Sequence, residues 1–289
     1  MKKLYVVVPA FLFVFASVCA QNDSVSLPGD TKPITQPEKK ERPKEVYTLK
    51  PGVDIPVTVT GTVWSLFAFS KIYSKDPSDD EAVLALKKSD VNGFDRWGIR
   101  PYNKKIDDIS YLPFYASMPM PVLFLLDKRM RKDMAKLSFM YLEAMSVTGL
   151  LYTGSSFLTN RYRPYVYSEE TPLDFRTRGG GKNSFYAGHV ALVATSTFFM
   201  AQVYADYYPE SNMKWVFYGV ATAATGVTAW WRHRGGLHFP SDILLGITQG
   251  TLTGLLVPRF HRTRLIRNHN LSIMPFLGES NGLMVRYKL

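Results

Sequence analysis

The 289-residue chain has almost no cysteine, since Cys19 is the only one. It falls inside a segment typical of a secretory signal peptide, residues 1–20, which has a basic start, an apolar stretch and a small-residue site before Gln21. Removal of this segment would leave no cysteine, and this excludes disulfides, a cysteine metal site and a cysteine nucleophile. An uncleaved anchor helix is the alternative interpretation of the same segment.

The chain is also poor in overall hydropathy for a helical membrane protein, with a mean of −0.08. Aromatic residues nevertheless make up 14% of it, and they favour the boundary between lipid tails and headgroups. Polar segments must therefore lower the mean hydropathy of a chain that also contains apolar segments. One is a leader at 21–50, rich in Pro, Lys, Glu and Thr, which we expect to be disordered. Another is a polar loop at 74–111, which we expect to fold on the surface.

Six segments are apolar enough to be candidates for crossing a bilayer as helices. The second contains three prolines, and several others are interrupted by Ser, Thr and Gly, as helices packed on helices often are. We therefore predict an all-α fold, a six-helix transmembrane bundle, against the alternative of a soluble helical bundle. Alternating residues around 278–282 predict a short C-terminal β-hairpin. The six segments are 53–73, 112–126, 135–158, 187–208, 213–231 and 239–257.

The net charge of +11 points to anionic partners. Nucleic acid is one such partner, but much of the positive charge lies beside apolar segments. Anionic lipid headgroups or an anionic substrate explain this placement better. We therefore expect a membrane and a phosphorylated lipid as partners, with no nucleic acid and no obligate protein partner.

The sharpest chemical pattern joins Arg232, His238 and Asp242. An arginine offers forked, cationic donors to phosphoryl oxygens, and a neutral histidine can serve as a nucleophile. Asp242 follows His238 by four residues, on the same face of the expected helix, where a carboxylate can hold one ring nitrogen protonated. The alternative is a set of ordinary interfacial residues at a helix entry.

Two further clusters precede this one. Gly188 and His189 open the fourth apolar segment, where a glycine allows close backbone approach and helix amides stabilise anionic oxygen. His189 could then protonate a leaving oxygen. Arg161 and Arg163, the latter followed by Pro164, close the third segment. The alternatives are a structural histidine and a basic helix end, both common at membrane interfaces.

Together the three clusters resemble the motifs of the type 2 phosphatidic acid phosphatase family, which shares its core with vanadium haloperoxidases. The resemblance covers about residues 134–258, and the surrounding residues are similar to a branch found in Bacteroidetes-type Gram-negative bacteria. It implies a phosphatase catalytic core at 134–260. From the composition we expect N-terminal membrane helices and the polar loop at 51–133 before this core, and the basic tail with the hairpin at 261–289 after it. A haloperoxidase is disfavoured, because those enzymes are usually soluble.

The resemblance also implies roles for single residues. His238 would form a phosphohistidine, Asp242 would orient it and His189 would be the general acid. Arg163, Arg232 and the Gly188 amide would bind phosphate. It implies no cofactor and no catalytic metal, and the sequence contains no clear metal-ligand constellation. Apart from the resemblance, Asp54 at the edge of an apolar segment is interpreted as interfacial, and Glu143 as a packing or hydrogen-bonded residue, with contact to substrate as the alternative.

Two positions depart from the family pattern. Ser156 stands where the first motif has a lysine, and Arg161 or Lys182 could supply the missing charge. Ala187 stands where the second motif has a serine, so one hydrogen bond to the phosphoryl oxygens is lost. These departures motivate a second hypothesis, that of a catalytically impaired membrane scaffold.

The expected site faces the periplasm, at the outer face of the bacterial inner membrane. Basic residues at 128–132 and after Pro258 would then be cytoplasmic, as the positive-inside rule prefers. A cleaved signal conflicts with this orientation unless the proline-rich second segment does not cross fully. Lipid A phosphates are slightly favoured as substrates over undecaprenyl pyrophosphate, with phosphatidate and phosphatidylglycerol phosphate as further alternatives.

Overall fold

The computed structural model describes residues 45–263, 271–276 and 282–287. The expected signal peptide and the expected leader up to residue 44 lie outside these residues. The elements are α1 (Pro51–Ile72), α2 (Asp80–Leu84), η1 (Lys88–Asp90), α3 (Gly93–Arg96), α4 (Lys104–Ser110), α5 (Leu112–Ser117), η2 (Met120–Leu126), η3 (Met130–Asp133), α6 (Met134–Leu158), η4 (Pro164–Tyr167), α7 (Leu173–Arg176), η5 (Gly179–Lys182), α8 (Gly188–Tyr207), α9 (Met213–Arg234), α10 (Pro240–His261), β1 (Leu271–Phe276) and β2 (Gly282–Tyr287).

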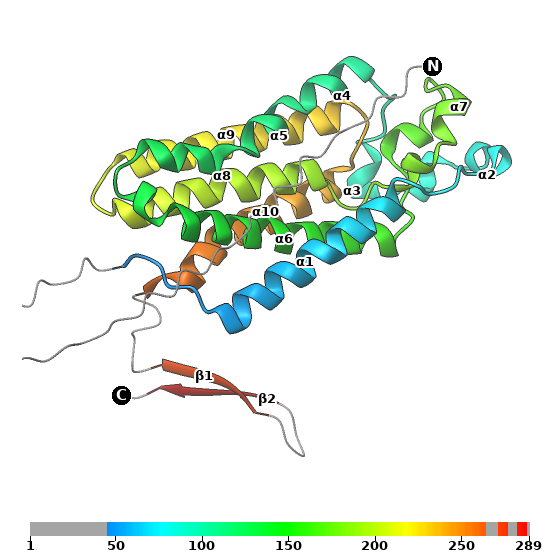
Figure 1. Cartoon of the computed structure of the whole chain (residues 1–289). Coiled ribbons are helices and arrows are strands. Elements are labelled where there is room, and N and C mark those ends of the chain that lie inside the picture. The colour runs from blue at the N-terminus through cyan, green and yellow to red at the C-terminus, as the bar shows by residue number, and fades with distance from the viewer. Residues whose placement is uncertain (1–44, 264–270, 277–281, 288–289) are drawn as a thin grey trace, which may run out of the picture. The chain divides into compact units, whose positions relative to one another are not determined.

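The predicted helical bundle is confirmed, and its long helices are α1, α6, α8, α9 and α10 (Figure 1). Helix α8 contacts α6, α9 and α10, while α1 packs on α6. Most residues of α8 are buried, including its Ser and Thr side chains. A helix with this many helical neighbours does not need a uniformly apolar surface, because its polar groups can bond across helices.

Helices α8 and α10 run parallel and very close together. A Cβ atom on Gly246 would lie 2.7 Å from the Ala187 carbonyl oxygen, and one on Gly250 would lie 2.2 Å from that of Ala191. Glycines spaced by four residues on one helix face permit such backbone contact. Because both contacts advance along the two chains in the same direction, the N-terminal ends of α8 and α10 lie at the same end of the bundle.

The second apolar segment begins earlier than predicted and is not one continuous helix. It consists of α4, α5 and η2, and its three prolines are Pro113, Pro119 and Pro121. A proline lacks the amide donor that the interior of a helix needs, so this segment breaks into short pieces. As a whole, Lys104–Leu126 is still apolar and long enough to cross a membrane.

Three segments of the described residues are long and apolar enough to span a bilayer: Pro51–Ile72, Lys104–Leu126 and Pro240–His261. Large apolar side chains are exposed along α1 and α9, among them Leu66 and Trp215. Exposed apolar surface of this kind suits contact with lipid. These features support a membrane protein, whereas the count of six crossings stays a prediction.

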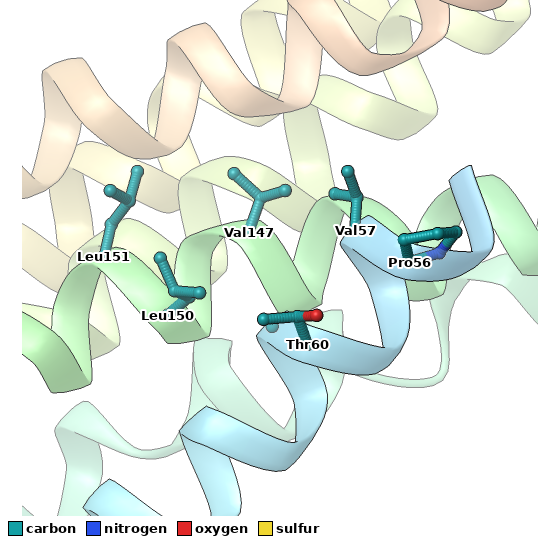
Figure 2. A pocket seen from close by; sticks show the side chains of 7 residues that line it. Pro56, Val57, Thr60, Val147, Leu150 and Leu151 are labelled. Atoms are coloured by element: carbon teal, nitrogen blue, oxygen red, sulfur yellow. The ribbon is translucent and has the colours of Figure 1, made fainter. Parts of the chain in front are cut away.

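An apolar groove of about 380 Å³ lies between α1 and α6 (Figure 2). None of the site residues expected from the sequence lines it, so the groove is separate from the expected chemistry. Its lining residues are Pro56, Val57, Thr60, Gly61, Val147, Leu150 and Leu151.

The expected disordered leader is wrong for residues 45–50. Tyr47 is only 1% exposed, and its hydroxyl donates a hydrogen bond to Asp206 at 2.9 Å. Tyr47 also forms an isolated antiparallel bridge with Arg262. An aromatic ring with a buried hydrogen-bond partner anchors this end of the segment. In the C-terminal region β1 and β2 pair antiparallel, with Leu271 opposite Tyr287, as the hairpin prediction requires.

Candidate active site

His238 lies in the tight turn that joins α9 to α10. Gly236 has a φ of +73°, and a Cβ atom there would meet the Pro101 carbonyl oxygen at 2.7 Å, so this turn requires glycine. His238 is 2% exposed, and its Nδ1 lies 2.7 Å from the Ser184 carbonyl oxygen. A carbonyl only accepts hydrogen bonds, so Nδ1 carries the proton. The Nε2 atom of the neutral ring therefore keeps its lone pair.

Three residues from other segments lie near enough to His238 for their charges to act on its ring. Burial lowers the pKa of His238 well below its ordinary value of 6.5, and the positive charges of Arg163 and Arg232 lower it further, with a smaller effect from His189. The imidazole is consequently neutral at physiological pH. Neutrality is what a nucleophilic histidine needs, and the convergence of the four residues around one anion stays a prediction.

Arg232, which is 2% exposed, is held in place by residues of α4. Its Nη1 donates to Asp107 Oδ1 at 2.8 Å and to Ser110 Oγ at 3.0 Å. The guanidinium also lies 5.6 Å from the centre of the Tyr111 ring. Its Nε is buried without a hydrogen-bond partner among the described residues. A buried arginine with an unused donor is suited to receiving an anion.

Arg163 is oriented by backbone carbonyls on two sides. Its Nε donates to the Gly180 oxygen at 3.0 Å, and its Nη1 to the Leu237 oxygen at 3.4 Å. Its own amide donates to the Gly181 oxygen at 2.8 Å. Arg163 thereby connects the loop that precedes α8 with the turn that carries His238.

His189 occupies the first turn of α8, between the rings of Tyr111 and Phe114, whose centres lie 4.7 and 5.1 Å away. The preceding Gly188 lies against Tyr152 of α6. A Cβ atom at position 188 would be 2.5 Å from the Tyr152 ring. The absence of a side chain at Gly188 therefore lets the start of α8, and with it His189, approach α6 this closely.

Asp242 does not make the predicted contact with the His238 ring. It is fully buried, and its Oδ2 accepts hydrogen bonds from Ser184 Oγ at 2.6 Å and from the Phe239 amide at 3.0 Å. The ring nitrogen instead meets the Ser184 carbonyl. The reason is geometric. Asp242 lies within the first turn of α10 and accepts from the Phe239 amide just before that helix, while Ser184 contacts both the Asp242 carboxylate and the His238 ring. Asp242 thus acts on His238 through Ser184.

Arg161, considered from the sequence as a phosphate ligand, is engaged by two carboxylates. One terminal nitrogen, Nη2, pairs with Asp95 Oδ2 at 2.6 Å, and the other, Nη1, pairs with Asp242. Its guanidinium also stacks over the Phe239 ring at 4.7 Å. Both terminal nitrogens of Arg161 therefore have carboxylate partners at the start of α10.

Lys75 contacts Ser156, the residue that stands where the family motif has a lysine. Ser156 is fully buried, and Lys75 Nζ donates to the carbonyl oxygens of Ser156 at 2.9 Å and Thr159 at 2.8 Å. Burial lowers the pKa of Lys75, and the nearby charge of Lys182 lowers it further. Lys75 and Lys182 are therefore neighbours at the end of α6, and positive charge remains available beside Ser156.

Sequence reasoning missed Asp95, Asp107 and Lys75, all of which lie in the polar loop at 74–111. Asp95 is 1% exposed and accepts from the Ser241 amide at 2.9 Å, so it caps α10 from α3. Burial would raise the pKa of Asp95, but hydrogen bonds from Ser241, Asn92 and Arg161 bring it below its ordinary value. An aspartate in a polar loop carries no sequence signal for such a role.

Comparison with known proteins gives one family match and one structural likeness. Residues 137–266 match the family model described as the PAP2 superfamily. The chain is also similar to the crystal structure of the first transmembrane PAP2 type phosphatidylglycerolphosphate phosphatase from Bacillus subtilis, with 16% identity and a TM-score of 0.42, over 73% of this chain and 98% of that one. A likeness of that degree says nothing about substrate. No curated protein matches the sequence significantly. The matched residues include the three motifs, and this match supports a type 2 phosphatidic acid phosphatase-like protein.

Proposed function

We propose that this protein is a membrane lipid phosphatase that works through a covalent phosphohistidine on His238. The observation that carries the proposal is one buried, neutral imidazole on which the charges of Arg163 and Arg232 act. Two arginines beside a helix N-terminus form an environment that favours a phosphate dianion. The free lone pair on His238 Nε2 provides the nucleophile.

The reaction follows as two displacements. The first displacement starts with His189 protonated, a state that the negative charge of the bound phosphate favours. His238 Nε2 then bonds to phosphorus, the bond to the leaving oxygen breaks, and His189 donates its proton to that oxygen. In the second, His189 takes a proton from water while the water oxygen bonds to phosphorus and the phosphorus–nitrogen bond breaks. Inorganic phosphate is released and both histidines return to their starting states. Arg163, Arg232 and the Gly188 amide stabilise the charge on the other phosphoryl oxygens.

Asp242 and Arg161 are positioning residues in this account. The Asp242 carboxylate holds the Ser184 hydroxyl, and the Ser184 carbonyl holds the His238 ring in its reactive tautomer. Arg161 joins Asp242 to Asp95, which fixes the first turn of α10. Groups that orient a nucleophile contribute to catalysis because small displacements slow the reaction strongly.

We further propose that the chemistry needs no metal and no cofactor, because arginine side chains supply the charge that metal ions supply in many phosphatases. Lys182 remains our candidate for the charge absent at Ser156, and Lys75 lies beside it. The loss of a serine at Ala187 weakens phosphate contacts without removing the nucleophile or the acid.

The substrate we propose is a lipid phosphate taken from the membrane, with lipid A slightly favoured over undecaprenyl pyrophosphate, phosphatidate and phosphatidylglycerol phosphate. The placement we propose is the bacterial inner membrane with the site facing the periplasm. The bundle supports this orientation. The basic stretch at 128–132 lies beside the start of α6 and Arg259 near the end of α10, whereas His238 precedes the start of α10. The packing of Met130 with Leu137 and Val257 in one cluster places both basic regions at the end away from His238.

The test is phosphate release by the purified protein in detergent from each of the four lipid phosphates, with and without a chelator. We expect release from at least one, inhibition by vanadate, and none from His238→Ala that still unfolds with a cooperative thermal transition. Continued release in chelator supports metal-free chemistry. No release from any of the four would favour the impaired scaffold, and full activity of His238→Ala would overturn the mechanism.

A lipid profile identifies the physiological substrate among these. Mass spectrometry of lipid A and of the polyprenyl phosphate pool after deletion of the gene should show added phosphate on lipid A. Accumulation of undecaprenyl pyrophosphate with unchanged lipid A would contradict the favoured substrate but not the chemistry.

A further inference from the structure

A second cluster of titratable side chains lies at the other end of the bundle. Asp54 in the first turn of α1, Glu143 in α6 and His261 at the end of α10 are 4%, 7% and 4% exposed. His261 Nε2 lies 3.2 Å from Asp54 Oδ2 and 3.2 Å from Glu143 Oε2. The three atoms lie within 4.8 Å of one another. Helix α10 has 22 residues, so about 33 Å of helix separates this cluster from His238.

The hydrogen bonding of His261 makes the cluster electron-rich. Its Nδ1 lies 2.8 Å from the Val257 carbonyl oxygen, which can only accept, so Nδ1 carries a proton. In the neutral ring, the Nε2 lone pair then faces two carboxylates. His261 Nε2 and Glu143 Oε2 are both buried without a hydrogen-bond partner in the described part of the chain. Asp54 Oδ2 accepts a hydrogen bond from the Lys50 amide, but the lone pair of Nε2 would still repel both carboxylates, and a cation, either a proton on Nε2 or a metal ion, removes this repulsion.

A second proton on His261 fits the observed geometry less well than a metal ion does. One N–H group shared between two equally distant carboxylates makes a bifurcated hydrogen bond at 3.2 Å, whereas a charge-assisted N–H···O contact directed at one acceptor is about 2.7–2.9 Å long. An imidazolium would also leave a net charge of −1 in a buried site, which is costly. Two ligands of a tetrahedral zinc ion, with bonds of about 2.0–2.2 Å, lie about 3.3–3.5 Å apart, and a dication brings the net charge to zero.

Two basic side chains near the cluster along the chain, Arg262 and Lys136, are paired elsewhere, and Lys50 and Arg259 are exposed. Arg262 forms an ion pair with Asp206 at 2.9 Å, and Lys136 lies 3.4 Å from Glu45. Neither of them therefore offsets the two carboxylates of the cluster.

We propose that Asp54, Glu143 and His261 bind a divalent transition metal ion of the zinc class. One imidazole and two carboxylates form a donor set that zinc accepts, with a water in the fourth position. The ion joins the end of α10 to α1 and α6, so it stabilises the bundle. The site is independent of the phosphatase chemistry proposed for His238.

The test uses the purified full-length protein in detergent, stripped with a chelator and then dialysed against Zn²⁺. Elemental analysis should find one zinc per chain, and zinc should raise the apparent Tm by several degrees, because an ion that binds only the folded state stabilises it. Glu143→Gln and His261→Gln conserve much of the side-chain volume and remove one ligand each, so both should lose the zinc and the shift in Tm. Glu170→Gln, at an exposed position, and His238→Ala should keep both.

Failure of the wild type to take up zinc, or uptake by Glu143→Gln equal to the wild type, would overturn the proposal and leave a protonated His261 as the cation. If a variant does not fold, the comparison of stripped and zinc-loaded wild type still decides. Phosphate release by Glu143→Gln, assayed below the Tm of this variant, separates the two sites, because release should persist although the variant binds no zinc. If the wild type releases no phosphate, the zinc measurements still stand, because they do not depend on phosphatase activity.

Discussion

Replacing Gly188 by alanine tests whether the close approach of α8 to α6 places His189 for catalysis. The added Cβ atom would lie 2.5 Å from Cε2 and Cζ of Tyr152, whereas non-bonded carbon atoms rest about 3.5–4.0 Å apart. Tyr152 is only 5% exposed and has little room to retreat. The start of α8 must therefore move by on the order of 1 Å, because the contact is too short by about that much.

Two magnitudes follow from this displacement. Adding a methyl group to a well-packed interior costs about 1–3 kcal/mol, of which a better helix propensity returns at most about 1 kcal/mol. A catalytic group displaced by about 1 Å loses on the order of 100-fold in rate. We therefore expect Gly188→Ala to lower kcat/KM for phosphate release far more than it lowers stability.

The assay measures kcat/KM for phosphate release together with the apparent Tm. The matched control is Gly219→Ala in α9, where a Cβ atom would meet nothing within 4 Å and kcat/KM should stay unchanged. Adding Tyr152→Leu to Gly188→Ala should restore part of the activity by making room. Wild-type kcat/KM in Gly188→Ala would refute this explanation of the site.

Three further predictions concern charge. Arg161→Gln should lower the free energy of unfolding by about 3–5 kcal/mol, because Asp95 and Asp242 lose a buried partner. An unchanged Tm together with a raised KM would contradict this and would instead make Arg161 a phosphate ligand. Burial keeps the pKa of His238 well below 6.5, so the unfolded chain binds a proton there that the folded protein does not, and stability is lost as the pH falls below 6.5. At about pH 5.5 the free energy of unfolding of the wild type should be lower by about 1.4 kcal/mol relative to His238→Asn than at neutral pH. The measurement is the Tm of both proteins as a function of pH, and Tm curves that stay parallel would contradict this prediction. Lys182→Gln should raise KM about tenfold at an unchanged Tm, as expected for loss of about 1.4 kcal/mol of phosphate binding, and an unchanged KM would remove Lys182 from the site.

The long helices could be predicted from sequence because each keeps its apolar character over many residues. Helix α6 was expected at 135–158 and runs from Met134 to Leu158, and α8 was expected at 187–208 and runs from Gly188 to Tyr207. The segment before them was misplaced at its start. Lys104, Lys105 and two aspartates open α4, and a charged first turn is difficult to distinguish from a loop.

The motif residues could be located because their spacing is informative, but their partners could not. Asp95 and Asp107 contact Arg161 and Arg232 only through the tertiary fold. The hydrogen-bond acceptor of His238 was also misjudged, because four-residue spacing places Asp242 on one helix face only if His238 belongs to the helix. His238 precedes α10, so the rule did not apply.

The cluster of Asp54, Glu143 and His261 shows the same limit more strongly. Each residue lies in a different helix, and from the sequence Asp54 reads as interfacial and Glu143 as a packing residue. Only the packing of α1, α6 and α10 brings their side chains within contact distance. Metal ligands supplied one at a time by separate helices leave no spacing pattern to read.

The most direct test of the proposed mechanism is to trap the intermediate. His189→Ala lacks the base for the second displacement, so a diphosphate lipid, whose leaving group needs little protonation, should leave phosphate on the enzyme. Rapid quenching at neutral to alkaline pH followed by mass spectrometry should then find an acid-labile phosphoryl group on the peptide that contains His238. Product formation with no phosphoryl group on His238, or with the group on another residue, would contradict the account.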